Sequence, residues 1–599
     1  MKIKVAQYIA DFLVDNGIKD CFLVTGGGAM HLDDALGHKD GLHCVFNHHE
    51  QACSIAAEAY TRLTGKIAAV CVTSGPGGTN AITGVMGGWL DSIPMFVVSG
   101  QVKRETTVWS CPELGLRQLG DQEFNIIDSV SNMTKYAVMV TEPEKIAYHL
   151  EKALYLALDG RGGPVWLDIP LDVQGAYIES DTLSHFEPPQ KSEAQAFTVE
   201  LADTVLEKIK NANAPLILAG AGIRLGNAVD EFLKLVEKLD IPVVTAWNST
   251  DLLADSDPHF AGLPGTVGTR PGNFAVQNCD LLISLGCRLN IRMIGYNFGD
   301  FANKAEKIIV DIDPSELKKP TIKADMPICA DVRDVINLLL SREYTAPEKH
   351  KPWLNWCRAL IAKYPAALPE YENSKALNPY TFMDKLSDCL ADNDNIICGN
   401  GSACVISFQA LRTKQGQRMF TNSGCAAMGY GLPAALGAAV ADNTKRTVCI
   451  DGDGSVMMNI QELATIAYNR LNVKVIILNN NGYHSIRQTQ KNLFKPPFIG
   501  IDSDSGICFP DFEMLAKSFG LPYYSISDKD AIAGVMGEIL EKPGACVCEV
   551  VVDPEQNFSP KSSSKVMPDG SITSPTLSDM APFLPREEYE AIKYEPFGQ

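Results

Sequence analysis

The sequence contains no stretch that approaches the roughly 20 uncharged apolar residues of a membrane span. Residues 1–17 predict an amphipathic helix in which Asp11 and Asp15 interrupt the apolar residues, and they lack the hydrophobic core of a signal peptide. No repeat of solenoid period is visible. We therefore expect a cytoplasmic protein that does not bind a membrane.

Paired cysteines and a basic patch are also missing. The 17 cysteines stand singly, with no CxxC motif and an odd total, which is typical of reduced thiols and not of a disulfide framework. The 52 Lys and Arg residues are outnumbered by 72 Asp and Glu, which gives a net charge of -20. Because such a surface repels nucleic acid, we do not expect nucleic acid as a partner.

What the sequence does contain is enough apolar material for several hydrophobic cores. At 599 residues it exceeds the size at which one core stops growing, so about three or four domains are expected. Short apolar runs that end in Gly or polar turns alternate with helical patterns, which predicts an α/β fold with parallel sheets. The predicted strands are 21–24, 68–72, 95–98, 216–218, 281–284, 447–450 and 473–478.

Two segments of weak periodicity, 181–197 and roughly 344–379, predict interdomain linkers, the second with one linking helix. They divide the chain into three doubly wound parallel-sheet domains. The predicted domains are residues 1–180, 195–345 and 375–555. Residues 556–599 are rich in Ser and Pro and predict either a surface arm packed on the body or a lid over the active site.

The most specific motif is Gly-Asp-Gly-Ser at 452–455, which follows one predicted strand and is followed by a helix and the strand 473–478. This order places the glycine turn beside the end of the second strand, at the carboxyl edge of a parallel sheet. Asp453, the side chain of Asn480 and the backbone carbonyl of Gly482 would there offer three hard oxygen ligands, suited to Mg²⁺. A bare GDG also occurs as a plain tight turn.

The same turn is suited to an anion beside the metal. Gly452 and Gly454 allow close backbone approach, and Ser455 begins a helix whose N-terminal amides can receive a phosphate. The full pattern, GDGS followed after about 25 residues by Asn-Asn, resembles the diphosphate-binding signature of thiamine-diphosphate enzymes. The resemblance implies thiamine diphosphate and Mg²⁺ as cofactors.

Enzymes of this kind also need a glutamate that hydrogen-bonds the aminopyrimidine ring of the cofactor and so activates it. The resemblance assigns this role to Glu50, because His49-Glu50-Gln51 matches the RHEQ segment of acetolactate synthases. The arginine of that segment is replaced by Asn47 or His48. Taken alone, Glu50 is equally an ordinary carboxylate at a helix N-terminus.

Further segments extend the resemblance to thiamine-diphosphate enzymes. They are the SGPGGTN turn at 74–80, the DQE at 121–123, and the segments 399–405 and 424–433. Val405 would force the cofactor into its bent form, although an aliphatic residue there is also typical of a plain core. The residues that the resemblance places at thiamine diphosphate are Gly26, Gly27, Pro76, Asn80, Gln122, Ala403, Val405, Met428, Gly452, Gly454, Ser455 and Tyr483.

The likeness to acetolactate synthases covers nearly all of residues 1–555. It implies a homodimer or homotetramer with active sites at the subunit interface, where Glu50 of one subunit meets Asp453 of another. In that family the middle domain holds FAD, although related enzymes have an empty or ADP-filled middle domain. The residues implied at FAD are Arg161, Gly222, Arg288, Arg292 and Asp311; arginine donors facing a pyrophosphate are physically reasonable.

Positions that face substrate in the family differ here. Leu171 replaces the lysine of IPKD, Arg487 and Thr489 replace the first and last residues of MQW, and Asp121 replaces the Phe of FQE. An extra segment at roughly 105–119 adds Trp109 and Arg117 beside Arg104. These changes put polar groups where the family has apolar ones, and buried polar groups need a partner that satisfies them.

We therefore predict a carboligase that decarboxylates a 2-oxo acid, plausibly pyruvate, and transfers the fragment to a carbonyl acceptor. The substitutions favour an acceptor larger and more polar than pyruvate, such as a keto sugar or a phosphorylated carbonyl compound. The alternatives are a flavin-dependent 2-oxo acid oxidase, a simple 2-oxo acid decarboxylase, and a noncatalytic scaffold that retains the fold.

Overall fold

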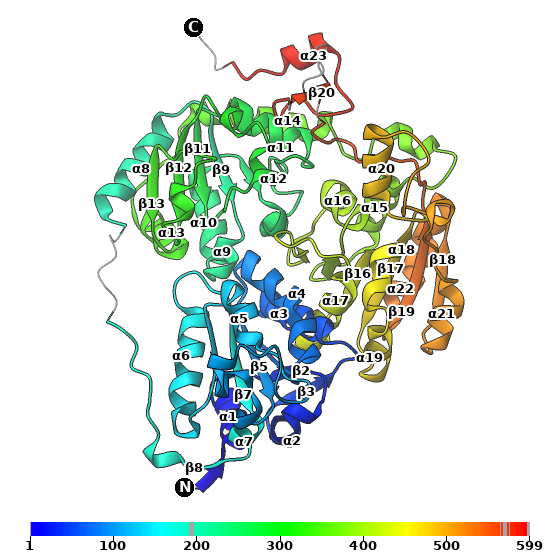
Figure 1. Cartoon of the computed structure of the whole chain (residues 1–599). Coiled ribbons are helices and arrows are strands. Elements are labelled where there is room, and N and C mark those ends of the chain that lie inside the picture. The colour runs from blue at the N-terminus through cyan, green and yellow to red at the C-terminus, as the bar shows by residue number, and fades with distance from the viewer. Residues whose placement is uncertain (1, 191–196, 564, 567–571, 574, 596–599) are drawn as a thin grey trace.

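A computed structural model describes residues 2–190, 197–563, 565–566, 572–573 and 575–595. These residues form three large sheets of parallel strands and two small antiparallel pairs. In Figure 1 the first large sheet lies at the bottom in blue and cyan, the second at the upper left in green, and the third at the right in yellow to orange. The predicted fold class, three doubly wound α/β domains, is confirmed.

The first large sheet has the strand order β3-β2-β4-β5-β7-β6. Its strands are β2 (Asp20–Leu23), β3 (His43–Phe46), β4 (Ala69–Val72), β5 (Met95–Gln101), β6 (Tyr136–Met139) and β7 (Pro164–Pro170). Its helices are α1 (Val5–Asp15), α2 (Met30–Gly37), α3 (Glu50–Thr64), α4 (Pro76–Asp91), α5 (Ile126–Val130), α6 (Ile146–Leu158) and α7 (Leu171–Gln174). A short antiparallel pair joins β1 (Lys2–Lys4) to β8 (Tyr177–Glu179).

The third large sheet has the order β15-β14-β16-β17-β19-β18. Its strands are β14 (Asn395–Cys398), β15 (Arg418–Phe420), β16 (Thr447–Gly452), β17 (Val473–Asn479), β18 (Tyr523–Ile526) and β19 (Cys546–Val551). Its helices are α15 (Pro379–Cys389), α16 (Ser402–Ala410), α17 (Gly431–Ala441), α18 (Asp453–Val456), α19 (Glu462–Tyr468), α20 (His484–Leu493), α21 (Phe512–Ser518) and α22 (Ile532–Glu541).

The middle sheet has the order β10-β9-β11-β12-β13. Its strands are β9 (Pro215–Ala219), β10 (Val243–Thr245), β11 (Leu281–Leu285), β12 (Glu306–Asp311) and β13 (Met326–Cys329). Its helices are α8 (Val199–Asn211), α9 (Gly222–Leu225), α10 (Val229–Leu239), α11 (Arg270–Asn278), α12 (Ile291–Ile294) and α13 (Val332–Ser341). The predicted linking helix is α14 (Lys351–Lys363).

The strand order creates a topological switch point in each sheet, between β2 and β4, between β9 and β11, and between β14 and β16. At such a point the chain leaves neighbouring strands in opposite directions, and a crevice opens beyond their carboxyl ends. The turns at these places carry the glycine-rich motifs of the sequence. The first and third sheets share one topology, so their crevices are built alike.

The first and third sheets share one hydrophobic core. Val70 of β4 and Val475 of β17 belong to a single buried cluster, with α3 and α17 between the two sheets. The helices cross so closely that a Cβ on Gly437 would lie 2.1 Å from the carbonyl oxygen of Ala56. Only glycine permits this approach. The two domains therefore pack as one body, as the centre of Figure 1 shows.

The linker and the tail are described in part. Residues 191–196 of the predicted linker and 567–571 and 596–599 of the tail lie outside the described residues. The described tail packs on the middle and third domains. Gln409 donates to the carbonyl of Pro560 at 2.6 Å, and the ring of Tyr594 lies 4.8 Å from that of Trp353. Among the described helices, which include α23 (Arg586–Ala591), none combines the length and apolar character that crossing a membrane requires.

Candidate active site

The predicted metal ligands lie on adjoining turns of the third sheet. Asp453 begins α18 directly after β16, and Asn480 and Gly482 follow the neighbouring strand β17. Gly452 and Leu478 are paired in register, so both turns leave the same edge of the sheet. The Oδ2 of Asp453 accepts a hydrogen bond from the backbone N–H of Gly482 at 2.9 Å.

The side chain of Asn480 is 5% exposed, and its Oδ1 has no hydrogen-bond partner among the described residues. A buried oxygen without a donor is unfavourable unless a ligand satisfies it. Asp453 is also buried, at 1% exposed. One carboxylate and one unsatisfied amide oxygen on adjoining turns fit a hard cation such as Mg²⁺.

Glycine is required at two positions of this site. A Cβ on Gly454 would lie 2.1 Å from Cε1 of Tyr483, and a Cβ on Gly482 would lie 1.9 Å from the carbonyl oxygen of Ile501. Gly482 also has a φ of 142°, which L side chains rarely adopt. By contrast, nothing lies within 4 Å of a Cβ on Gly452, so this turn faces open space.

Arg487, a predicted substrate residue, lies beside the loop that carries the expected metal ligands. Its side chain is 5% exposed, and it donates to the carbonyl oxygens of Asn480 at 3.0 Å and Asn481 at 2.6 Å. Arg487 therefore braces this loop, and its contact with substrate stays a prediction.

Burial changes the acidity of this turn. It raises the pKa of Asp453 to about 6, although hydrogen bonds from Gly482 and Gly454 oppose the shift. It also raises the pKa of Asp451 to about 7. Asp451 is fully buried, and its Oδ2 has no partner among the described residues. Sequence reasoning did not single out Asp451, although it stands in the same motif.

The raised pKa of Asp453 predicts that metal binding weakens in mild acid. Below about pH 6 the carboxyl of Asp453 is protonated in the metal-free protein, and a metal must displace that proton. We expect Tb³⁺ affinity to fall about tenfold between pH 7 and pH 5, because the deprotonated fraction of the carboxyl falls by about this factor. The measurement is Tb³⁺ luminescence without thiamine diphosphate, so that phosphate protonation does not contribute. Asp451→Asn should keep this dependence. A Tb³⁺ affinity that does not change between pH 7 and pH 5 would contradict the assignment of Asp453 as a metal ligand.

Glu50 is the first residue of α3 and lies at the carboxyl end of β3. Its Oε2 accepts a hydrogen bond from Nδ2 of Asn80 at 3.0 Å. The Nδ1 of His49 accepts from the backbone N–H of Gln51 at 3.1 Å, which caps the helix. The carboxylate of Glu50 therefore projects from a rigid helix start and is half-buried.

The remaining first-domain positions meet at the switch point between β2 and β4. Gly26 and Gly28 donate their backbone N–H groups to Asp33 Oδ2 at 3.0 Å and Thr73 Oγ1 at 3.1 Å. Gln122 has a φ of 60°, and its carbonyl oxygen would lie 2.4 Å from a Cβ on Gly75. Gly27 begins a short 3-10 turn and Pro76 begins α4. Asp33, whose pKa burial raises to about 6, was not identified from the sequence.

The residues expected beside the pyrimidine ring lie at the switch point of the third sheet. Ala403 and Val405 are buried on α16, at 0% and 3% exposed, within the core cluster on that face. Met428 is half-buried. Ser455 Oγ accepts from the backbone N–H of Gly429 at 3.0 Å, which ties this segment to the GDGS turn. Val405 is thus part of a core, and its predicted contact with the cofactor stays a prediction.

The other predicted substrate residues are divided between two domains. Asp121 and Thr489 are exposed, and Leu171 is half-buried at the start of α7. The hydroxyl of Thr489 donates to the carbonyl of Ser485 at 3.0 Å, within its own helix. Thr489 lies in the third domain and the other two in the first, and a substrate site shared by all three stays a prediction.

All five residues predicted at FAD line one cavity of about 840 Å³ between the first and middle domains. They are Arg161, Gly222, Arg288, Arg292 and Asp311. The guanidinium of Arg292 lies over the ring of Trp247, 5.5 Å from its centroid. Arg161 is already paired with Asp313 at 3.0 Å and Glu316 at 2.8 Å. The cavity is within the size range of cofactor sites.

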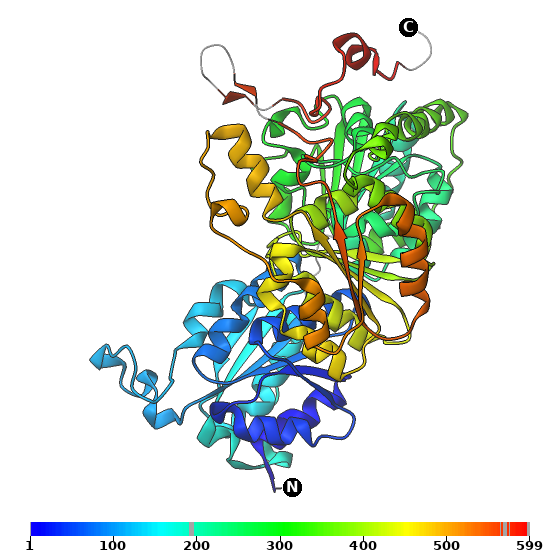
Figure 2. The ribbon, with the colours of Figure 1, turned by 90° about the vertical axis from the view of Figure 1, so that its right-hand side faces the viewer.

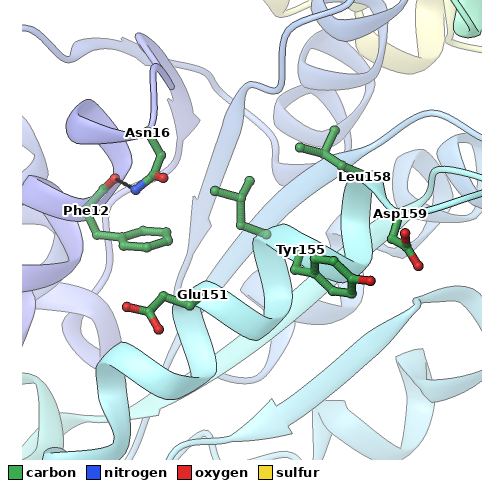
Figure 3. A pocket seen from close by; sticks show the side chains of 7 residues that line it. Phe12, Asn16, Glu151, Tyr155, Leu158 and Asp159 are labelled. Atoms are coloured by element: carbon green, nitrogen blue, oxygen red, sulfur yellow. Dashed lines mark hydrogen bonds between the residues drawn. The ribbon is translucent and has the colours of Figure 1, made fainter. Parts of the chain in front are cut away.

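A second hollow of about 420 Å³ lies between α1 and α6; none of the predicted site residues lines it, although Leu158 also borders the larger cavity. Figure 3 shows Phe12 and Asn16 on one side and Glu151, Tyr155 and Leu158 on the other. Glu151 accepts a hydrogen bond from the backbone N–H of Phe186 at 2.7 Å. This hollow is open, and its carboxylate is engaged within the fold.

Comparison with protein families matches each sheet to a separate domain model. Residues 3–149 match the N-terminal TPP binding domain of thiamine pyrophosphate enzymes, 202–339 match their central domain, and 399–550 match their C-terminal TPP binding domain. Thiamine pyrophosphate is another name for thiamine diphosphate.

Similar proteins extend over almost the whole chain. The acetolactate synthase isozyme 1 large subunit of Escherichia coli (strain K12) is 31% identical over 561 residues, which cover 93% of this chain and 95% of the relative. The acetolactate synthase large subunit of Cyanidium caldarium is 30% identical, with 93% and 96% covered. The probable acetolactate synthase large subunit of Methanocaldococcus jannaschii is 30% identical, with 99% and 98% covered.

Proposed function

Since this chain belongs to the acetolactate synthase family of thiamine-diphosphate enzymes, we propose that it decarboxylates pyruvate and transfers the fragment to an acceptor larger and more polar than pyruvate. That the protein is a thiamine-diphosphate-dependent carboligase follows from the family, so this prediction is confirmed and the oxidase alternative is not favoured. One observation carries the proposal: Glu50 follows β3, and the pair Asp453 and Asn480 follow β16 and β17, so both groups lie at the carboxyl edges of two sheets with the same strand order.

In this proposal each half of the site has its own task. Asp453, Asn480 and the carbonyl of Gly482 hold Mg²⁺, and the amides at the start of α18 receive the diphosphate. When bound, thiamine diphosphate supplies the carbon nucleophile that takes up the 2-oxo acid. Glu50 holds a proton against the aminopyrimidine ring, and Asn80 orients its carboxylate at 3.0 Å.

We further propose a homodimer or homotetramer in which Glu50 of one chain meets Asp453 of another. Large apolar side chains exposed in both halves of the site support this arrangement. In the first domain, Trp109 is 58% and Leu114 62% exposed; in the third, Phe494 is 64% and Ile499 78% exposed. Burial of these residues between copies would complete the site.

The proposed acceptor, a keto sugar or a phosphorylated carbonyl compound, rests on the replaced positions Leu171, Asp121 and Thr489 and on the extra segment at 105–119. This segment projects from the body as a light-blue arm in Figure 2. Directly before this segment, Arg104 donates to the carboxylate of Asp172 at 2.7 Å. Arg487, a further replaced position, also braces the loop of the proposed metal ligands through the carbonyl oxygens of Asn480 and Asn481.

The proposed function predicts products that pyruvate alone does not give. Purified protein, thiamine diphosphate, Mg²⁺ and labelled pyruvate are incubated with keto sugars, phosphorylated aldehydes and ketones, and 2-oxobutyrate as separate acceptors. We expect labelled two-carbon adducts with a polar acceptor, formed about tenfold or more faster than acetolactate, since apolar-to-polar pocket changes discriminate at this level. Mass spectrometry identifies the products. Conversion of pyruvate to acetolactate at ordinary synthase rates would refute the acceptor proposal.

We also propose that FAD occupies the middle-domain cavity, because all five predicted residues line it. Arg288→Glu should lower flavin affinity about 10- to 100-fold, the usual cost of losing a charge-assisted hydrogen bond. Bound flavin per chain, read from visible absorption after reconstitution, is the measurement. Arg333→Glu, at an exposed ion pair with Glu231, is the control. An ADP-filled or empty cavity in the wild-type protein would contradict FAD.

A cytoplasmic location is proposed from the thiols. All 17 cysteines are free, and most are buried in the cores. Unpaired thiols in this number persist in a reducing compartment.

A further inference from the structure

Glu462, near the start of the third domain's helix α19, is a buried acid whose partners lie in the first domain. Its side chain is 0% exposed. Its Oε2 accepts from Asn47 Nδ2 at 2.9 Å and its Oε1 accepts from the backbone N–H of His48 at 3.0 Å. Thr465 adds a third donor at 2.8 Å. No Lys or Arg pairs with this carboxylate in the described part of the chain, so neutral donors from the segment before Glu50 satisfy it.

A second side chain holds the segment on the other side of Glu50. Asn459, also 0% exposed, donates to Gln51 Oε1 at 3.1 Å and to the carbonyl oxygen of Gly429 at 2.7 Å. Residues before and after Glu50 are thus fixed by one short stretch of the third domain. The Glu50 carboxylate itself accepts one hydrogen bond among the described residues, from Asn80, so its position depends on these neighbours.

The same stretch continues directly from the diphosphate turn. Asp453 begins α18 (Asp453–Val456), a 3-10 turn (Met457–Asn459) follows, and Glu462 begins α19. Gly429, which accepts from Asn459, donates its own N–H to Ser455 at 3.0 Å. Within one chain, hydrogen bonds therefore connect the turn expected to bind diphosphate with the helix start that carries Glu50, and in the proposed oligomer these two parts belong to different active sites.

We propose that Glu462 and Asn459 are positioning residues that form an interdomain clamp, with Asn47 and Gln51 as its first-domain side, and that this clamp sets the orientation of the Glu50 carboxylate. The proposal rests on the function proposed above, because it assumes that Glu50 activates the cofactor.

A charge-swap cycle tests the clamp. Glu462→Gln turns one acceptor oxygen into a donor against Asn47 or His48, and Asn47→Asp sets two carboxylates face to face. Each single change should lower kcat about 10- to 100-fold and change KM for pyruvate less than about twofold, since misorientation of a catalytic group affects turnover more than substrate binding. The double variant restores one donor and one acceptor, so kcat should return to within about threefold of wild type.

The control is Asp394→Asn, another acid-to-amide change in the third domain. Asp394 is 4% exposed and pairs with Arg446 at 2.6 Å. It directly precedes β14, at the amino ends of the strands, whereas the GDGS turn lies at their carboxyl ends. It should lower the melting temperature but leave kcat unchanged. The clamp is overturned if Glu462→Gln keeps wild-type kcat, or if the swap restores the melting temperature without restoring kcat.

Glu50→Gln, measured beside the cycle, separates the two ideas. If Glu50→Gln loses turnover while Glu462→Gln does not, the clamp is wrong and the role of Glu50 stands. If Glu50→Gln turns over at the wild-type rate, the proposed function itself is wrong.

Discussion

Glu50→Gln is expected to lower turnover by about 10²- to 10⁴-fold, the usual contribution of a proton-transferring side chain. Gln keeps the shape and the hydrogen bond from Asn80, which lies 3.0 Å from the carboxylate, but it cannot hold the proton that cofactor activation requires. Binding of thiamine diphosphate should change less than about threefold, since the metal and diphosphate contacts lie in the third domain. Steady-state kinetics and calorimetric titration measure the two quantities.

The matched control is Glu200→Gln, because Glu200 is likewise in the first turn of a helix, α8 of the middle domain. Its kinetics should equal those of the wild type. Glu50→Asp shortens the side chain by one methylene and should retain more activity than Glu50→Gln. Unchanged turnover in Glu50→Gln would refute the assigned role, whereas loss of cofactor binding would mean that Glu50 acts mainly as a binding group.

Asp453→Asn is expected to weaken Mg²⁺-dependent binding of thiamine diphosphate by more than about 10- to 100-fold. That factor is the usual cost of losing a residue that contacts a metal ligand, and Asp453 is itself a proposed ligand. The substitution removes the one carboxylate among the three proposed ligands. It also places an amide where Oδ2 now accepts the N–H of Gly482. Cofactor titration at fixed Mg²⁺, followed by activity at saturating cofactor, is the measurement.

Two comparisons separate metal binding from folding in this variant. Asp384→Asn, at a surface ion pair with Arg412, should leave cofactor affinity unchanged. Raising the concentration of Mg²⁺ should recover part of the activity of Asp453→Asn, because the remaining oxygen ligands are intact. Wild-type cofactor affinity at limiting Mg²⁺ would show that Asp453 is not a metal ligand.

Most of the fold could be predicted from the sequence because its cause is local. All seven strands named from apolar runs are present; Ala68–Val72, for example, corresponds to β4 (Ala69–Val72). A strand that is buried on both faces needs a continuous apolar run, and the turn after it needs glycine or a polar residue. The GDGS turn and its partner Asn480 could be found for the same reason, since they follow neighbouring strands.

The surroundings of the positions expected to face substrate could be predicted less well. Arg487 donates to the carbonyl oxygens of Asn480 and Asn481, neighbours that its place in the sequence did not indicate, and its contact with substrate stays a prediction. A charged residue on a short helix has several directions available, and its periodicity does not say which neighbour it will meet. Asp33 in α2 and Asp451 in β16 were missed because a single Asp within a helix or strand has no pattern of its own.

The sequence by itself determined the three α/β domains and the family, and it singled out Glu50, Asp453 and Asn480 as the expected site residues. It could do so because strand patterns and glycine turns depend on residues close together in the chain. Only the tertiary structure decided that five scattered residues line one cavity, and that Asn47 and Glu462, 415 residues apart, share a buried hydrogen bond. Such contacts depend on the order in which strands assemble and on how closely α3 and α17 pack, and no local pattern encodes either.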